Sequence, residues 1–172
     1  KFDRDRFGML VRSIIAQQIS GAAARTIRGR VEQLVAPEKI TPENLRRLSE
    51  SQLRSAGLSS QKLSYIQDLA AKTADGVIDL RNIGRGDDEQ VIAQLTQVKG
   101  VGRWTAQMFL MFSLGRPDVF PEDDLGVRSA IRTLYSLPDL PDRATSRAIA
   151  QPWRPFASVA SWYCWRSIDL AK

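Results

Sequence analysis

The acidic stretch Pro121-Glu122-Asp123-Asp124 precedes a segment with helical apolar spacing and holds the carboxylates best placed to do chemistry. A carboxylate can stabilise a developing positive charge or position and activate a water molecule. Asp123 or Asp124 can also open the following helix as its N-cap, and the two roles are compatible. The stretch therefore offers both a helix start and a candidate catalytic acid.

Histidine is absent from the chain and cysteine occurs once, as Cys164. These counts exclude a Ser-His-Asp triad, a Cys-His dyad, an intrachain disulfide, His-ligated metals and four-cysteine zinc or iron–sulfur sites. Any chemistry must then use carboxylate, Lys, Tyr, Ser or backbone groups.

A second notable segment runs from Leu95 to Ala106 and contains Gly100-Val101-Gly102. Two helices are expected to meet there through a tight turn, with glycines that permit positive φ and let backbone N–H groups approach a phosphate closely. The second helix presents an N-terminus, whose unpaired N–H groups and dipole favour an anion. Lys99 and Arg103 add positive charge that carries no base specificity.

The sequence pattern predicts that the elements positioning these residues are helices along the whole chain. Apolar residues at helical spacing and helix-start and helix-stop residues predict helices near residues 5–19, 21–35, 41–48, 51–57, 60–74, 87–95, 103–114, 125–135, 143–150 and 155–169. Thr41 is expected to cap the third of these and Ser51 the fourth, and residues 77–83 could be extended. We therefore predict a compact all-α fold in one domain over residues 1–172.

The charge of the chain narrows its partners. Lys and Arg total 25 and Asp and Glu 19, which gives a net charge of +6 and a pI near 9.9. A basic domain suggests a polyanion such as nucleic acid. No apolar run reaches the roughly 18 residues of a membrane span, and no signal-peptide pattern begins the chain. Because the first residue is not Met, a segment can precede Lys1.

Taken together, these segments closely resemble the helix-hairpin-helix DNA glycosylase superfamily, and within it the 3-methyladenine DNA glycosylase II (AlkA-type) branch. The shorter all-helical members match better, because the β-rich N-terminal extension of many relatives is missing. The resemblance spans Phe7 to Trp165 and is carried, in the family's order, by Ser13-Ile-Ile-Ala-Gln-Gln-Ile-Ser20, Gly100-Val-Gly-Arg-Trp-Thr-Ala106, Asp118-Val-Phe-Pro-Glu-Asp-Asp-Leu-Gly-Val127, Trp153-Arg-Pro-Phe156 and Ala160-Ser-Trp-Tyr163.

The resemblance implies two helical lobes with an active-site cleft between them and makes Asp124 the catalytic acid. It also implies a monofunctional enzyme that flips an alkylated purine, of the 3-methyladenine or 7-methylguanine type, and hydrolyses its N-glycosidic bond to start base excision repair. Bifunctional relatives carry a Schiff-base Lys in the position that Trp104 occupies here. Neither a cofactor nor an iron–sulfur cluster is expected.

The implied base pocket consists of Trp104, Trp162, Met108 and Tyr163. Electron-rich rings suit a cationic base, although tryptophans at helical spacing can equally be core residues. Met108 stands where AlkA-type enzymes can carry Tyr, which suggests an altered base preference.

The remaining implied site residues contact DNA or hold an ion. The wedge that fills the space of the flipped base would be Gln18 with Ile19, which could also be ordinary helix-end residues. The DNA backbone would contact a set of hairpin residues and one residue of the next helix: Lys99, Gly100, Val101, Gly102, Arg103, Thr105 and Arg128. Carbonyls of Thr96, Val98 and Val101 could hold a structural Na⁺ or K⁺.

The expected partner is double-stranded DNA with alkylated bases, bound by a monomer with no membrane association. The expected location is intracellular: the cytoplasm or nucleoid of a bacterium, or the nucleus of a eukaryote. Two alternatives stay open, namely a helix-hairpin-helix module that binds DNA without chemistry, and a glycosylase of the same fold for deaminated or mismatched bases. Asp124 separates the first of these from an enzyme, because a pure binder does not need it.

Overall fold

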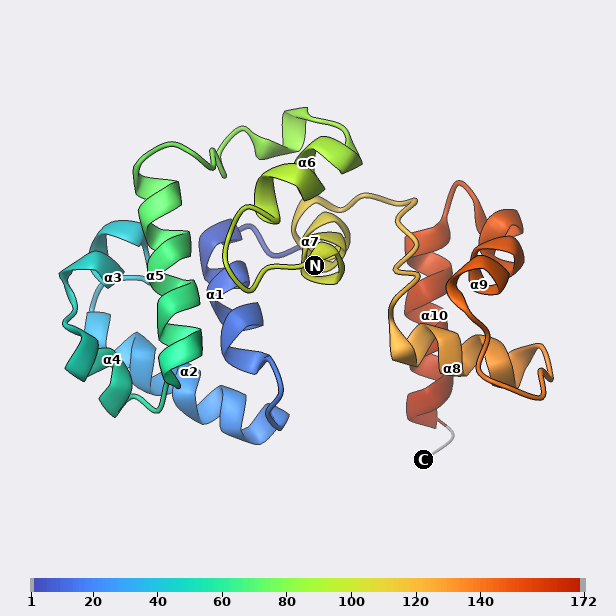
Figure 1. The fold of residues 1–172 in the computed structure, drawn as a ribbon, viewed down its shortest axis with the longest axis horizontal. Helices are drawn as coiled ribbons and strands as arrows, with labels where there is room; N and C mark the ends of the chain where they lie inside the picture. The colour runs from blue at the N-terminus through green and yellow to red at the C-terminus, as the bar shows by residue number, and fades with distance from the viewer. Residues whose placement is uncertain (1, 171–172) are drawn as a thin grey trace.

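The computed structural model describes residues 2–170, and all regular elements within that span are helical (Figure 1). The α-helices are α1 (Arg6–Ala16), α2 (Gly21–Val35), α3 (Pro42–Arg47), α4 (Glu50–Ser55), α5 (Ser60–Ala74), α6 (Asp88–Leu95), α7 (Arg103–Phe109), α8 (Leu125–Leu134), α9 (Arg143–Ala150) and α10 (Ala157–Leu170). This confirms the all-α prediction. Helices α1 to α7 form one group, and α8 to α10 form a second group beside α7.

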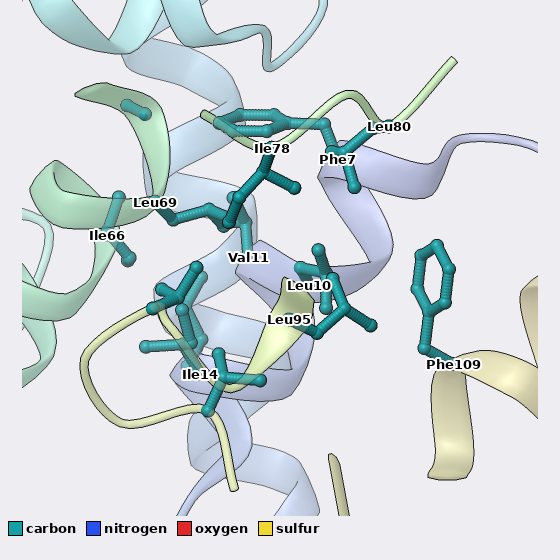
Figure 2. Close-up of a cluster of buried hydrophobic side chains, with 14 of the residues drawn as sticks. Phe7, Leu10, Val11, Ile14, Ile66, Leu69, Ile78, Leu80, Leu95 and Phe109 are labelled. Atoms are coloured by element: carbon teal, nitrogen blue, oxygen red, sulfur yellow. The ribbon is translucent and has the colours of Figure 1, made fainter. Parts of the chain in front are cut away.

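The first group, here called the N-terminal lobe, is built around α1. This helix buries Phe7, Leu10, Val11 and Ile14, which recur at helical spacing and pack with residues of α5 and α6 (Figure 2). Phe109 of α7 belongs to the same cluster, so the hairpin helix is anchored in the main core. Removal of this apolar surface from water is the main driving force that fixes α7 in place.

The second group, the C-terminal lobe, has a small core of its own. Val127, Ala130 and Ile131 of α8 pack against Cys164 of α10. Burial, together with the negative charge of nearby Asp124, raises the pKa of the Cys164 thiol to about 11. Trp165 packs against the cores of both lobes and thereby joins them at the start of α8.

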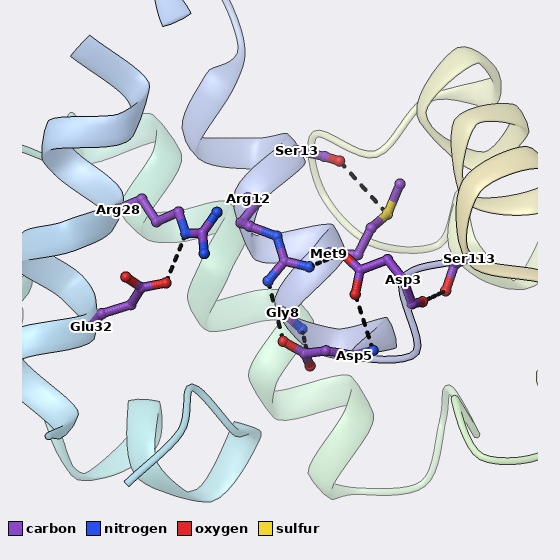
Figure 3. Close-up of polar contacts among 9 residues, drawn as sticks. All are labelled: Asp3, Asp5, Gly8, Met9, Arg12, Ser13, Arg28, Glu32 and Ser113. Carbon is purple, nitrogen blue, oxygen red and sulfur yellow. Dashed lines mark hydrogen bonds and ion pairs between the residues drawn. The ribbon is translucent and has the colours of Figure 1, made fainter. Parts of the chain in front are cut away.

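Polar groups fasten the N-terminal segment to the end of the α7 region (Figure 3). The Asp5 carboxylate accepts the Gly8 N–H and caps α1, and Arg12 forms ion pairs with both Asp3 and Asp5. The Ser113 hydroxyl donates to the Asp3 carbonyl over 2.8 Å. The chain entering α1 is therefore held against the segment that follows α7.

The helix starts follow the capping residues, with one correction. Thr41 caps α3 as predicted, with Pro42 in the first helical position. Ser49, and not Ser51, caps α4. Its hydroxyl accepts the Gln52 N–H, and the Gln52 side-chain oxygen accepts the Ser49 N–H, which completes a capping box.

Three predicted boundaries differ from the structure. The first helix ends at Ala16 and not near residue 19, since the C-cap Gln17 has a non-helical ψ of 130° and Gln18 follows in the left-handed conformation with φ +57°. The helix predicted to end at 114 is α-helical to Phe109 and continues as a π-helical turn over Leu110–Leu114.

The third difference concerns residues 77–83, which are not extended. They form turns that end in a short 3₁₀ helix, Ile83–Arg85, and still bury Ile78 and Leu80. Arg6 donates to the carbonyls of Leu80 and Arg81, so a side chain satisfies backbone groups that a strand partner would otherwise take.

Candidate active site

The hairpin between α6 and α7 contains two glycines that play different parts. Gly100 has φ +77°, and a Cβ placed there would lie 2.0 Å from the Tyr65 ring. Gly102 is the N-cap of α7 with φ −93°, and a Cβ there would meet nothing within 4 Å. The prediction of positive φ is therefore right for Gly100 and wrong for Gly102, which leaves open space in front of the α7 N-terminus.

Side chains of α5 brace this turn from below. Lys72 donates to the Gln97 carbonyl over 2.6 Å and to the Asp68 carboxylate over 2.8 Å. The same Asp68 oxygen accepts the Lys99 N–H over 2.8 Å. Burial opposes ionisation of Asp68, but these hydrogen bonds and the Lys72 charge outweigh it and lower its pKa. The turn is thus held rigid while its outer surface stays exposed.

The residues predicted to contact the DNA backbone differ in how free they are. Lys99, Gly100 and Gly102 are exposed, whereas the side chains of Val101 and Thr105 are buried and leave only backbone groups for a ligand. The phosphate contacts themselves stay predictions.

The two arginines of that set already have partners. Arg103 donates through both terminal nitrogens to the Glu89 carboxylate, which raises the pKa of the Arg103 guanidinium. Arg128 donates to the Pro141 carbonyl over 2.8 Å. A phosphate contact by either side chain would have to replace or share these bonds.

Asp124 lies buried at the junction of the two lobes, with 8% of its surface exposed. Its Oδ1 accepts the Val127 N–H over 2.8 Å, so Asp124 and not Asp123 caps α8. Oδ1 also accepts the Trp165 indole N–H, and Oδ2 accepts the Trp104 indole N–H, each over 2.8 Å. All three donors are neutral, so they orient the carboxylate and leave its negative charge in place.

Trp165 is the site residue that the sequence interpretation missed. Its indole donates to Asp124, and its ring packs in a tilted arrangement, centroids 5.9 Å apart, against Phe112, a partly exposed ring of the π-helical turn. A Cβ on Gly126 would lie 3.0 Å from the Trp165 ring, so the glycine makes room for it. The only signal in the sequence was its position three residues after Trp162, which places both on neighbouring sides of one helix.

The other residues predicted for the base pocket differ in exposure, and their contact with a base stays a prediction. Trp162 is 46% exposed on α10, 5.2 Å from the Tyr163 ring and 5.9 Å from the Arg166 guanidinium. Tyr163 is more exposed still. Met108 is buried in the core of the N-terminal lobe, and this placement does not support its predicted role in contacting a base.

The predicted wedge lies beside the hairpin. Gln18 and Ile19 are both exposed, and the left-handed backbone of Gln18 is a strained conformation for a residue with a Cβ. The neighbouring Gln17 donates to the Gly100 carbonyl over 2.8 Å. The segment predicted to enter the minor groove and the turn predicted to bind phosphate are therefore in direct contact.

The predicted cation site involves carbonyls of the same turn. The Val98 carbonyl accepts the Val101 N–H over 3.1 Å, which uses one of its two lone pairs and is compatible with an ion on the other. Binding of an ion by Thr96, Val98 and Val101 stays a prediction. Over residues 2–170, no helix is long and apolar enough to cross a membrane.

Comparison with known proteins identifies the family. Residues 11–155 match the family described as "HhH-GPD superfamily base excision DNA repair protein". DNA-3-methyladenine glycosylase 1 of Schizosaccharomyces pombe is 34% identical over 170 residues, which cover 98% of this chain and 75% of the yeast protein.

Two solved structures agree with this match. The crystal structure of a DNA-3-methyladenine glycosidase from Bacillus halodurans has a TM-score of 0.89 at 38% identity and covers 96% of this chain and 76% of its own. The S. pombe 3-methyladenine DNA glycosylase in complex with abasic DNA has a TM-score of 0.88 at 33% identity, with 99% and 86% covered. By sequence and by fold, this chain belongs to the HhH-GPD superfamily of base excision DNA repair proteins.

Proposed function

We propose that this protein is a monofunctional DNA glycosylase that removes alkylated purines, of the 3-methyladenine and 7-methylguanine type, from double-stranded DNA. The observation that carries the proposal is the Asp124 carboxylate, held at the junction of the lobes by one indole from each lobe. The relatives named as a DNA-3-methyladenine glycosylase and a DNA-3-methyladenine glycosidase support the substrate class.

The chemistry needs what this site provides. Cleavage of the N-glycosidic bond develops positive charge on the sugar, and a fixed carboxylate stabilises an oxocarbenium-like transition state. Because the donors to Asp124 are already in place, little reorganisation energy is needed when positive charge develops on the sugar. Alkylation at N3 or N7 makes the purine a cationic leaving group, so departure needs little general-acid help.

DNA would be held by the hairpin and opened by the wedge. The exposed Lys99-Gly100 turn and the α7 N-terminus offer positive charge and free N–H groups to a phosphate. Gln18 would enter the space left by the flipped base, a step that costs about a few kcal/mol. A monovalent cation on the Thr96, Val98 and Val101 carbonyls would reinforce the turn, and no other cofactor is proposed.

The proposal is tested by incubating the protein with duplex DNA treated with a methylating agent and identifying released bases by mass spectrometry. We expect 3-methyladenine and 7-methylguanine, an intact strand with an abasic site, and no borohydride-trapped covalent adduct, since Trp104 stands where bifunctional relatives have Lys. Tight binding without base release would instead support a non-catalytic module. Release of deaminated bases alone would assign another lesion.

The indole of Trp165 gives a more local prediction. Trp165→Phe keeps an aromatic ring against Phe112 but removes the N–H that donates to Asp124. A hydrogen bond to a charged group is worth about 1.5–3 kcal/mol, so we expect the single-turnover excision rate to fall about 10- to 100-fold. Trp162→Phe is the matched control on the same helix, and we expect it to keep that rate within about threefold. Equal rates for both variants would contradict the orienting role of Trp165.

A further inference from the structure

The loop before α8 places three acids in sequence, and the structure treats them differently. Glu122 forms an ion pair with Arg147 at 3.2 Å, and Asp123 forms one with Arg143. Asp124 is held by two indoles and a backbone N–H. Two of the three negative charges are thus matched by arginines of α9, while the third receives only neutral donors.

The position of these arginines on α9 is not explained by the helix itself. Arg143 is its first residue, where the helix dipole disfavours a cation and favours Asp or Glu. Arg147 follows four residues later, so both side chains lie on one face of α9. Each arginine side chain is about 60% exposed, and the acids beneath them are 34% exposed at Asp123 and 20% at Glu122. The arginine side chains are therefore more exposed than the acids with which they pair.

The charges of these acids reach the DNA-binding hairpin. Glu122 and Asp123 both contribute to raising the pKa of Arg103 at the start of α7. Glu122, Arg147 and Arg103 line the same cavity of about 300 Å³ between the hairpin and the C-terminal lobe. Left unpaired, two carboxylates here would add negative charge next to groups that must approach phosphates, at distances where screening by salt is incomplete.

We propose that Arg143 and Arg147 of α9 are charge-compensating residues, which neutralise Asp123 and Glu122 so that the loop carrying Asp124 can lie against DNA with only one uncompensated charge. In this role the arginines act through the acids and not through contacts with phosphate. The inference rests on the proposed function, because it concerns the approach of DNA to the Asp124 loop.

A double-mutant cycle on the full chain tests this directly. Affinity for a duplex with a stable abasic-site analogue is measured from 50 to 200 mM salt for the parent, Arg143→Gln/Arg147→Gln, Glu122→Gln/Asp123→Asn, and the combination of all four changes. We expect the arginine variant to bind about tenfold more weakly at the lowest salt. The combined variant has the parent's net charge, and we expect its affinity within about threefold of the parent and its salt slope unchanged.

The opposite outcome is equally distinct. If the arginines contact phosphates, neutralising the acids does not restore the affinity for DNA. The combined variant then lacks about two phosphate contacts, and the slope of log affinity against log salt concentration becomes shallower by roughly 0.9 for each contact. The control is Arg46→Gln/Arg54→Gln, which removes two exposed, ion-paired arginines of α3 and α4 and should change affinity less than threefold. If the control loses as much DNA affinity as the α9 variant, the effect depends only on the net charge of the protein, and the proposal is wrong.

Two further measurements support the interpretation. A double-mutant cycle with Arg143→Gln and Asp123→Asn alone repeats the test with fewer changes, and circular dichroism checks that each variant is folded. A parent protein that fails to bind the abasic duplex would contradict the proposed function itself. A parent that binds, combined with no rescue by the acid changes, would contradict this inference alone.

Discussion

Asp124→Asn is expected to lower the single-turnover rate of 3-methyladenine release by about 10³-fold, equivalent to about 4 kcal/mol of lost transition-state stabilisation. The substitution removes the charge that faces the sugar while keeping the shape of the side chain. Asn is as good an N-cap as Asp, so α8 keeps its start. DNA affinity should be unchanged or tighter, because one negative charge leaves the interface.

The matched control is Asp142→Asn, at the N-cap of α9. The Asp142 carboxylate accepts the Thr145 N–H over 2.7 Å, much as Asp124 accepts the Val127 N–H. Both changes therefore remove one charge from a capping residue. We expect Asp142→Asn to keep the excision rate within about threefold. An Asp124→Asn protein that is folded, binds DNA and still excises at the parent rate would remove Asp124 from the catalytic role.

The second large effect is expected from Gly100→Ala, which should destabilise the fold by about 3 kcal/mol. A left-handed backbone costs a non-glycine residue about 1–2 kcal/mol, and displacing the Tyr65 ring adds about 1–3 kcal/mol. For a chain of this size the melting temperature should fall by about 6–12 °C. Thermal unfolding followed by circular dichroism measures this loss.

Gly102 gives the comparison, because it separates binding from folding. A Cβ at this position enters open space at an ordinary φ, so Gly102→Ala and Gly102→Asp should melt within about 2 °C of the parent. Gly102→Asp places a negative charge at the α7 N-terminus, and we expect about 10- to 100-fold weaker binding to DNA. Parent-like affinity in the folded Gly102→Asp protein would contradict the hairpin as the phosphate-binding element.

Much of this protein follows from interactions between residues close in the chain. Helical apolar spacing predicts α1, α5 and α8 within a few residues, because each must bury one face. Thr41 caps α3, as the sequence Thr41-Pro42 predicts, and Asp124 was one of two candidates for the N-cap of α8. The motifs around Gly100 and Asp124 are two of the five short segments that indicate the family, since each of these segments is local in the sequence.

Contacts between segments distant in the sequence could not be predicted from these local patterns. Trp162 and Trp165 are equivalent by residue type, and only the docking of α10 against α8 decides that Trp165 meets Asp124 while Trp162 faces outward. Met108 was expected at the site, but the packing of α7 turns it into the core. Arg103 and Arg128 were predicted to contact the DNA backbone, and only the structure shows that they hydrogen-bond Glu89 and the Pro141 carbonyl.

The physical reason is the range of the interactions. Caps and helical periodicity act within about four residues and are written into short stretches of sequence. The face that a helix turns toward its neighbour, and the acid that each arginine meets, depend on how separate elements pack. Sequence alone therefore determined that Asp124 begins α8 or neighbours its first residue. Tertiary structure decided that two tryptophans from different lobes hold its carboxylate and that α9 neutralises the acids beside it.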